Sequence, residues 1–208
     1  MPLKIAEKTQ ERWLAALAAL LAAALAWFAF GWQPELPETP LPRAAAPAGG
    51  DFVLQSAAGP VDLRSFRGRL TLIYFGYTFC PDVCPTSLAA TSEGLKRLTP
   101  DEAARVAMLF VSVDPERDTP ARLKEYAEFF HPGMVGVTGQ PDELAAIARR
   151  YGAFYARQAV ATAGEGYVVD HTSDTYVVGP DGRLLGKIGH ATPPDEVVTI
   201  LRNYLKQN

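Results

Sequence analysis

The segment TFCPDVCP, residues 78–85, contains both cysteines of this 208-residue chain. An uninterrupted apolar segment, residues 70–77, precedes it, and a segment with helical spacing, residues 86–98, follows it. A continuous apolar run of this length is typical of a central β-strand that is covered on both faces. The sequence therefore predicts two thiols at the point where a buried strand ends and a helix begins.

The spacing of the two cysteines allows their thiols to meet. Residues four apart lie on the same face of a helix, so Cys80 just before the helix and Cys84 in its first turn can converge. The positive end of the helix dipole stabilises thiolates, which are both metal ligands and redox nucleophiles. Helical Cα atoms four residues apart are about 6 Å from each other, which also permits a disulfide. The pair therefore predicts a metal site or a redox-active dithiol.

Two thiolates form a soft but incomplete ligand set, which favours Cu(I), with Zn²⁺ as the main competitor. A third ligand would come from a histidine or a methionine. The candidates are His131, His171, His190, Met108 and Met134.

Among these candidates, His171 stands apart because it lies in the polar cluster DHTSD between two strand-like segments. Asp170 or Asp174 could orient its imidazole from outside the ligand set. The two methionines lie in apolar strand segments and are expected in the core, whereas His131 and His190 lie at the ends of predicted elements. From the residues alone, His171 remains a candidate ligand rather than an assigned one.

The rest of the chain predicts an α/β fold. Further helices are expected at 119–130, 141–151 and 194–205, the first capped by Thr119 with Pro120 at its first position. Further strands are expected at 52–54, 61–63, 106–113, 134–137, 153–157, 167–169, 175–178 and 183–188. Hairpin turns are expected at Gly59-Pro60 and Asp181-Gly182, and a loop at 158–166. Alternating strands and helices followed by a hairpin and a helix predict a mixed central sheet with helices on both faces. A cysteine pair between its first central strand and a helix is the thioredoxin arrangement.

The N-terminal part of the chain predicts a membrane anchor. Residues 13–32 are uncharged, and 20 residues of helix at about 1.5 Å each span a bilayer core of about 30 Å. Lys4, Lys8 and Arg12 precede this run, so residues 1–12 are expected in the cytoplasm. A cleaved signal peptide is the alternative, although its apolar core would be only about 7–15 residues long. Residues 33–50, rich in Pro and Ala, are expected to be a semi-rigid tether, and residues 51–208 the domain.

Composition narrows the function class. The net charge of −3 gives no reason to expect a nucleic-acid partner. Two cysteines are too few for a disulfide scaffold. Glu7 and Glu11 do not fit a mitochondrial transit peptide, which is poor in acidic residues. We therefore expect a single-pass protein of a bacterial inner membrane with its domain in the periplasm.

Taken together, these features resemble the Sco/SenC family of copper-binding, membrane-anchored, thioredoxin-like proteins. The resemblance covers about residues 51–205 and the single anchor. The matching segments are FGYTFCPDVCPTSL (75–88), VSVDPERDTP (111–120), the region of Phe129-Phe130 and YVVDHTSDTYVVGPDGRL (167–184). The resemblance implies that Cys80, Cys84 and His171 are the copper ligands.

The resemblance also implies a role. The chain would accept copper from a periplasmic donor and deliver it to the binuclear CuA centre of cytochrome c oxidase subunit II, as a carrier rather than an enzyme. Thiolates favour Cu(I), and the histidine makes Cu(II) tolerable. The alternative is a thiol–disulfide oxidoreductase that reduces the cysteines of that centre with Cys80 and Cys84, leaving His171 as a bystander. A peroxiredoxin-like peroxidase is the weakest candidate, because the surroundings typical of a peroxidatic cysteine are absent.

Overall fold

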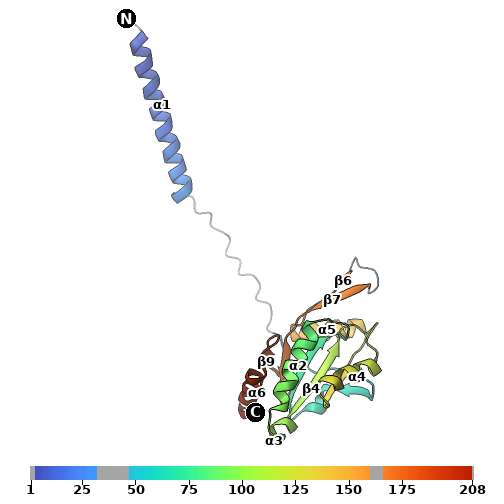
Figure 1. Cartoon of the computed structure of the whole chain (residues 1–208). Coiled ribbons are helices and arrows are strands. Elements are labelled where there is room, and N and C mark those ends of the chain that lie inside the picture. The colour runs from blue at the N-terminus through green and yellow to red at the C-terminus, as the bar shows by residue number, and fades with distance from the viewer. Residues whose placement is uncertain (1–2, 32–46, 160–165, 208) are drawn as a thin grey trace. The chain divides into compact units, whose positions relative to one another are not determined.

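The computed structural model describes residues 3–31, 47–159 and 166–207 (Figure 1). Contacts divide the chain into two units, residues 1–44 and 45–208. In the first unit, helix α1 (Leu3–Ala26) continues into the π-helical turn η1 (Trp27–Gly31). Residues Arg12–Gly31 are long and apolar enough to cross a membrane, with a mean hydropathy of 2.2. Most of the predicted tether lies outside the described residues.

The second unit is built on a five-stranded mixed sheet with the strand order β5-β4-β3-β8-β9. Strands β3 (Leu70–Gly76), β4 (Val106–Ser112) and β5 (Met134–Val137) are parallel. Strand β8 (Thr175–Val178) pairs antiparallel with β3, and β9 (Leu184–Ile188) pairs antiparallel with β8 at the edge of the sheet. Every residue of β3 is buried, as its continuous apolar sequence predicts. The predicted mixed sheet is confirmed.

Helices cover both faces of this sheet. Successive strand residues point to opposite faces. The Tyr74 ring stacks on Phe110 and its hydroxyl donates to the carbonyl of Val83 in α2. The next residue, Phe75, packs on Tyr151 of α5, with ring centroids 5.7 Å apart. The helices are α2 (Val83–Lys96), α3 (Pro100–Ala104), α4 (Pro120–Phe130), α5 (Pro141–Tyr151) and α6 (Pro194–Gln207).

The first hairpin turns two residues earlier than expected. Strands β1 (Val53–Ser56) and β2 (Gly59–Asp62) place Ala57 and Ala58 in the turn, so the predicted turn at Gly59-Pro60 is wrong. The Ser56 hydroxyl accounts for this position, because it accepts a hydrogen bond from the Ala58 amide and donates one to the Gly59 carbonyl. A side chain that bonds its own turn can replace the usual turn residues.

Helix α3 was not expected from the sequence. Its start carries a reciprocal capping box, in which Thr99 accepts from the amide of Glu102 and Glu102 accepts from the amide of Thr99. The motif T-P-D-E contains both the capping spacing and a proline at the first helical position, which favour a helix start. The helix is too short to show the apolar periodicity by which the longer helices were predicted.

Like β1 and β2, strands β6 (Tyr155–Ala159) and β7 (Tyr167–His171) form a two-stranded sheet of their own beside the main sheet. Strand β6 pairs antiparallel with β7, and the register places Tyr155 opposite His171. Strand β6 extends two residues into the predicted loop 158–166, and residues 160–165 of that loop lie outside the described residues. Figure 1 shows the hairpin extending from the body of the domain. His171 is therefore the last residue of a hairpin that the main sheet does not include.

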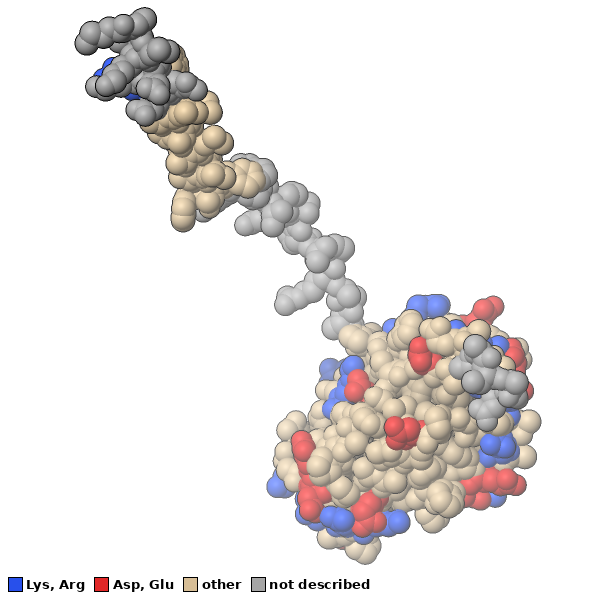
Figure 2. Space-filling model, turned by 45° about the horizontal axis from the view of Figure 1, so that its top comes forward, with Lys and Arg blue, Asp and Glu red and all other residues tan. Residues whose placement is uncertain are grey.

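Charged side chains of both signs are interspersed on the domain. Figure 2 shows one face of it, on which Lys and Arg alternate with Asp and Glu along the margin and most of the centre is uncharged. The described ion pairs include Lys124 with Glu128 and Arg97 with Asp195, both exposed to solvent. Mixed charge of this kind keeps a domain soluble without creating a large field of one sign.

Candidate metal centre

The two cysteines occupy the junction between β3 and α2. Cys80 lies in the connecting loop and Cys84 in the first turn of the helix, with exposed fractions of 8% and 0%. Both are free thiols, and the Cys84 amide donates to the Cys80 sulfur across 3.4 Å. The predicted convergence of the two thiols is confirmed. The helix begins at Val83, three residues earlier than the predicted helical segment.

Gly76, the last residue of β3, makes room for the Cys84 sulfur. A Cβ atom at this position would lie 2.7 Å from that sulfur and 2.9 Å from the Tyr74 ring. Non-bonded Cβ atoms do not approach other heavy atoms to less than 3.0 Å, so any other side chain at this position would displace the thiol or the ring. A glycine in a strand interior often marks such a close approach. The end of β3 therefore helps to set the position of Cys84.

His171 completes the centre from the end of β7. Its Nε2 atom lies 3.1 Å from the Cys84 sulfur, and its Nδ1 atom lies 2.9 Å from the carbonyl oxygen of Thr172. A carbonyl only accepts, so a hydrogen bond there requires a proton on Nδ1 and leaves Nε2 of the neutral ring with its lone pair toward the sulfurs. The rings of Tyr74 and Tyr77 meet the imidazole edge-on at 6.1 and 5.8 Å. The two sulfurs and a ring nitrogen all lie within 4.8 Å of one another.

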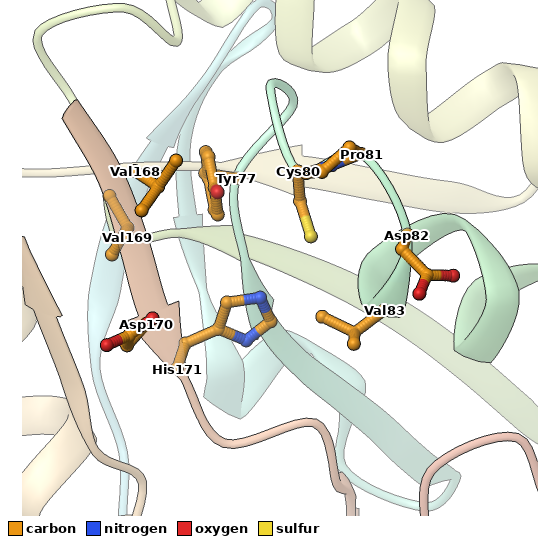
Figure 3. A pocket seen from close by; sticks show the side chains of 9 residues that line it. All are labelled: Tyr77, Cys80, Pro81, Asp82, Val83, Val168, Val169, Asp170 and His171. Atoms are coloured by element: carbon orange, nitrogen blue, oxygen red, sulfur yellow. The ribbon is translucent and has the colours of Figure 1, made fainter. Parts of the chain in front are cut away.

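The imidazole has a different orienting partner from the one expected. Asp174 pairs with Lys187 at 2.9 Å. Asp170 is exposed, and Figure 3 shows its carboxylate turned away from the ring. The expectation that one of these carboxylates orients the imidazole is therefore corrected, since the backbone carbonyl of Thr172 occupies that position. Both kinds of acceptor hold a histidine in one tautomer.

A surface pocket of about 360 Å³ opens onto this centre. Figure 3 shows the Cys80 sulfur and the His171 ring facing one another across it. Its lining residues are Tyr77, Cys80, Pro81, Asp82, Val83, Val168, Val169, Asp170 and His171. Cys84 lies deeper and is fully buried. An ion arriving from solvent would thus meet Cys80 and His171 first.

The two thiols differ in acidity. A hydrogen bond from Cys84 lowers the pKa of Cys80 far below the ordinary thiol value, and the backbone amides of Cys84 and Asp82 act in the same direction against the effect of burial. Burial raises the pKa of Cys84, and the neighbouring Cys80 raises it further. In the metal-free protein, Cys80 is therefore the thiolate and Cys84 the thiol that donates to it.

This difference predicts the pH dependence of alkylation. An ordinary thiol becomes unreactive as the pH falls below about 8.5, because only the thiolate attacks iodoacetamide. Because the pKa of Cys80 is lowered, its alkylation rate should stay on a plateau down to about pH 6, well below that value. Mass spectrometry of the reduced, metal-free chain would give the rate at each pH. A midpoint near 8.5 would contradict the lowered pKa, and Cys80→Ser provides the control, with slow labelling of Cys84.

The segment VSVDPERDTP supports the centre in a way that sequence reasoning did not identify. Asp118 is fully buried and accepts hydrogen bonds from the amide and the hydroxyl of Thr78 and from the hydroxyl of Ser112. These bonds tie the loop before Cys80 to the end of β4. The signal in the sequence was a pair of acidic residues, Asp114 and Asp118, directly after a predicted central strand.

The other candidate ligands lie elsewhere. Met108 and Met134 are core residues, with exposed fractions of 2% and 4%. The Nδ1 atom of His190 lies 2.7 Å from the Ser87 hydroxyl. His131 caps the C-terminus of α4, and burial lowers its pKa, so it does not favour the cationic form suited to a helix C-terminus. Among the described residues, His171 alone of the three histidines joins the cysteines in a potential metal site.

The donor set fits a soft metal ion. Bonds of roughly 2.0–2.3 Å to nitrogen and sulfur place pairs of ligand atoms about 3.5–4.5 Å apart. The observed spread, up to 4.8 Å, therefore needs only a small contraction around an ion. Two thiolates and one imidazole suit Cu(I) and Zn²⁺, whereas hard cations prefer oxygen ligands.

Comparison with known proteins gives a consistent result. The family model described as SCO1/SenC matches residues 41–206. An SCO2-like protein of Rickettsia conorii is 37% identical over 156 residues, which are 74% of this chain and 76% of that protein. The structure of Bradyrhizobium japonicum ScoI with copper bound is 41% identical, with a TM-score of 0.67 over 75% of this chain and 98% of that one. BsSco, described with a disulfide switch and as a member of the Sco family of cytochrome c oxidase assembly proteins, is 27% identical, with a TM-score of 0.61 over 79% and 96%.

Proposed function

Because the chain belongs to the SCO1/SenC family, we propose that it binds one copper ion through Cys80, Cys84 and His171. The observation that carries this proposal is the convergence of two thiol sulfurs and an imidazole nitrogen within 4.8 Å, from segments 87 residues apart in the chain. Soft sulfur ligands select Cu(I), and the imidazole supplies a third ligand acceptable to both copper oxidation states. The copper-bound relative, ScoI, shares the fold around this site.

Copper is the cargo in this proposal. The chain receives it from a periplasmic donor and delivers it to the CuA centre of cytochrome c oxidase subunit II. The pocket beside Cys80 supports transfer, because an incoming ligand from a partner can reach the ion there. BsSco is described as belonging to a family of oxidase assembly proteins, which supports the same client.

The apolar helix places the domain at a membrane in this proposal. The uncharged residues 13–32, most of which belong to this helix, span the bacterial inner membrane once, with Lys4, Lys8 and Arg12 on the cytoplasmic side and the domain in the periplasm. A location beside the membrane keeps the carrier near a membrane-bound oxidase. A cleaved signal segment is the alternative role for the same helix, and it would release the domain.

One observation favours a second function, reduction of the client's cysteines. Cys80 carries the lowered pKa expected of an attacking thiolate, and it faces the pocket. It would attack a disulfide in the client and form a mixed disulfide, which Cys84 would then resolve. The client would gain two electrons and two protons as two thiols, and the chain would be left with a Cys80–Cys84 disulfide. Copper binding and this reaction use the same sulfurs and exclude each other.

A transfer experiment separates the two functions. The full-length chain in detergent, loaded with Cu(I), is mixed anaerobically with the metal-free CuA domain of a bacterial oxidase subunit II, either reduced or as its disulfide. We expect copper to appear on the reduced client faster than from a small chelator buffering the same free Cu(I). In a parallel reaction the metal-free chain is mixed with the disulfide client. If copper stays on the loaded chain, and the metal-free chain reduces the disulfide client, the delivery proposal fails and the reductase remains.

A further inference from the structure

The hairpin that carries His171 needs an attachment to the domain beyond its own pairing. Strands β6 and β7 form a separate two-stranded sheet, so the hydrogen bonds of the main sheet do not fix where β7 lies. At the base of the hairpin, the Thr172 amide donates to the Phe154 carbonyl, and the Phe154 amide donates to the Thr172 hydroxyl. Both partners belong to the hairpin region, so these bonds leave its approach to the cysteines undetermined.

Arg117 supplies an attachment on the β7 side. Its guanidinium lies 3.8 Å from the centroid of the Tyr167 ring and donates to the Tyr167 carbonyl at 3.0 Å. Its Nε atom donates to one oxygen of Asp114, and the Tyr167 hydroxyl donates to the other oxygen at 2.6 Å. The Asp114 side chain is fully buried, and that of Arg117 is 18% exposed. Arg117, Asp114 and Tyr167 thus form a closed set of contacts between β7 and the segment after β4.

The same guanidinium also contacts the segment that leads to Cys80. It lies 5.5 Å from the ring centroid of Tyr77 and 4.9 Å from that of Phe79. These aromatic residues are three and one positions before Cys80. The Tyr77 ring in turn meets the His171 ring edge-on at 5.8 Å. Arg117 therefore joins the segment that carries Cys80 to the strand that carries His171.

The attachment of Tyr167 also constrains His171, because both residues lie on strand β7. Side chains alternate along a strand, so Tyr167, Val169 and His171 share one face of β7. Val169 is 4% exposed, which shows that this face is turned into the domain. Fixing Tyr167 at one end of a five-residue strand therefore constrains the face on which the imidazole lies at the other end.

We propose that Arg117 is a positioning residue for the metal centre, which holds β7 against the Cys80 segment so that His171 stays within reach of both sulfurs. This inference rests on the proposed copper site. The planar guanidinium stacks on aromatic rings and donates in fixed directions at the same time, which the ammonium group of lysine does not reproduce. Arg117→Lys keeps the charge beside Asp114 and removes the stacking and the fork of donors.

A double-mutant cycle on Cu(I) affinity tests this role. The full-length chain in detergent, as wild type, Arg117→Lys, His171→Ala and the double variant, competes for Cu(I) with a chromophoric chelator. Loss of a residue that orients a metal ligand weakens affinity by about 10- to 100-fold, and we expect Arg117→Lys to do so in the wild-type background. In the His171→Ala background we expect less than about a threefold further loss, because the ligand that Arg117 positions is already gone.

A merely structural role would weaken Cu(I) binding equally in both backgrounds, and that result, or an unchanged affinity in the first background, overturns the inference. Arg122→Lys is the matched control. The described side-chain contacts of Arg122 are stacking on Phe79 and a hydrogen bond to the Thr78 hydroxyl, and both partners lie in the segment that leads to Cys80. Its effect should be the same with and without His171. If His171→Ala itself leaves Cu(I) affinity unchanged, both the three-ligand proposal and this inference fail. If only Arg117→Lys is silent, the inference alone fails.

Discussion

Replacing Cys84 by serine should weaken Cu(I) binding by more than about 100-fold, because even residues that only orient a metal ligand are worth about 10- to 100-fold in affinity. Serine has a side chain of similar size to cysteine but carries a hard oxygen in place of the soft sulfur, and Cu(I) binds hard oxygen ligands weakly. Cys84 is fully buried, so its sulfur is the deepest of the three ligand atoms. Chelator competition on the full-length chain in detergent measures the effect.

Ala89→Ser serves as the matched control for this variant. It introduces the same side chain at an exposed position of α2, where we expect no change in Cu(I) affinity. Far-ultraviolet circular dichroism checks that both variants keep their helical content. If the Cu(I) affinity of Cys84→Ser is within about tenfold of wild type, the loss is smaller than expected for removal of a metal ligand, and Cys84 is not a ligand.

Replacing Asp118 by alanine should lower the free energy of unfolding by about 3 kcal/mol or more, because buried donors left without an acceptor cost about 1–3 kcal/mol each. Three donors lose their acceptor in this variant, the amide and hydroxyl of Thr78 and the hydroxyl of Ser112. For a chain of this size the loss corresponds to a fall in Tm of roughly 6–12 °C. Calorimetry of the metal-free chain measures it.

Glu128→Ala is the control for the stability prediction. Glu128 is an exposed carboxylate of α4 that pairs with Lys124 at the i,i+4 spacing. Such pairs contribute about 0.3–0.5 kcal/mol, so this variant should unfold close to the wild-type temperature. An Asp118→Ala variant that loses less than about 1 kcal/mol would mean that the freed donors find other partners.

The central features of the fold could be predicted because they depend on local patterns. The apolar run of β3, the proline after Thr119 and the turn at Asp181-Gly182 each act through short-range sequence, and the structure contains the expected strand, helix and hairpin. The cysteine pair is also local, because Cys80 and Cys84 are only four positions apart in the chain. The meeting of His171 with the cysteines was expected through the family resemblance and not through spacing.

The features that were missed depend on tertiary geometry or on backbone atoms. A sequence does not show that the Thr172 carbonyl, rather than the carboxylate of Asp170 or Asp174, bonds the imidazole. Likewise, the contact of Arg117 with Tyr167 joins residues 50 positions apart through a stacking geometry that leaves no periodic pattern. Backbone acceptors and folded aromatic contacts therefore limit such predictions more than the choice of ligands does.

The X-ray absorption spectrum of Cu(I) bound to the full-length chain counts the atoms around the metal and so tests the three-ligand copper site. We expect one copper per chain with two sulfur ligands and one imidazole nitrogen, and His171→Ala should remove the nitrogen while leaving both sulfurs. A wild-type spectrum with two sulfurs and no nitrogen would contradict the three-ligand site.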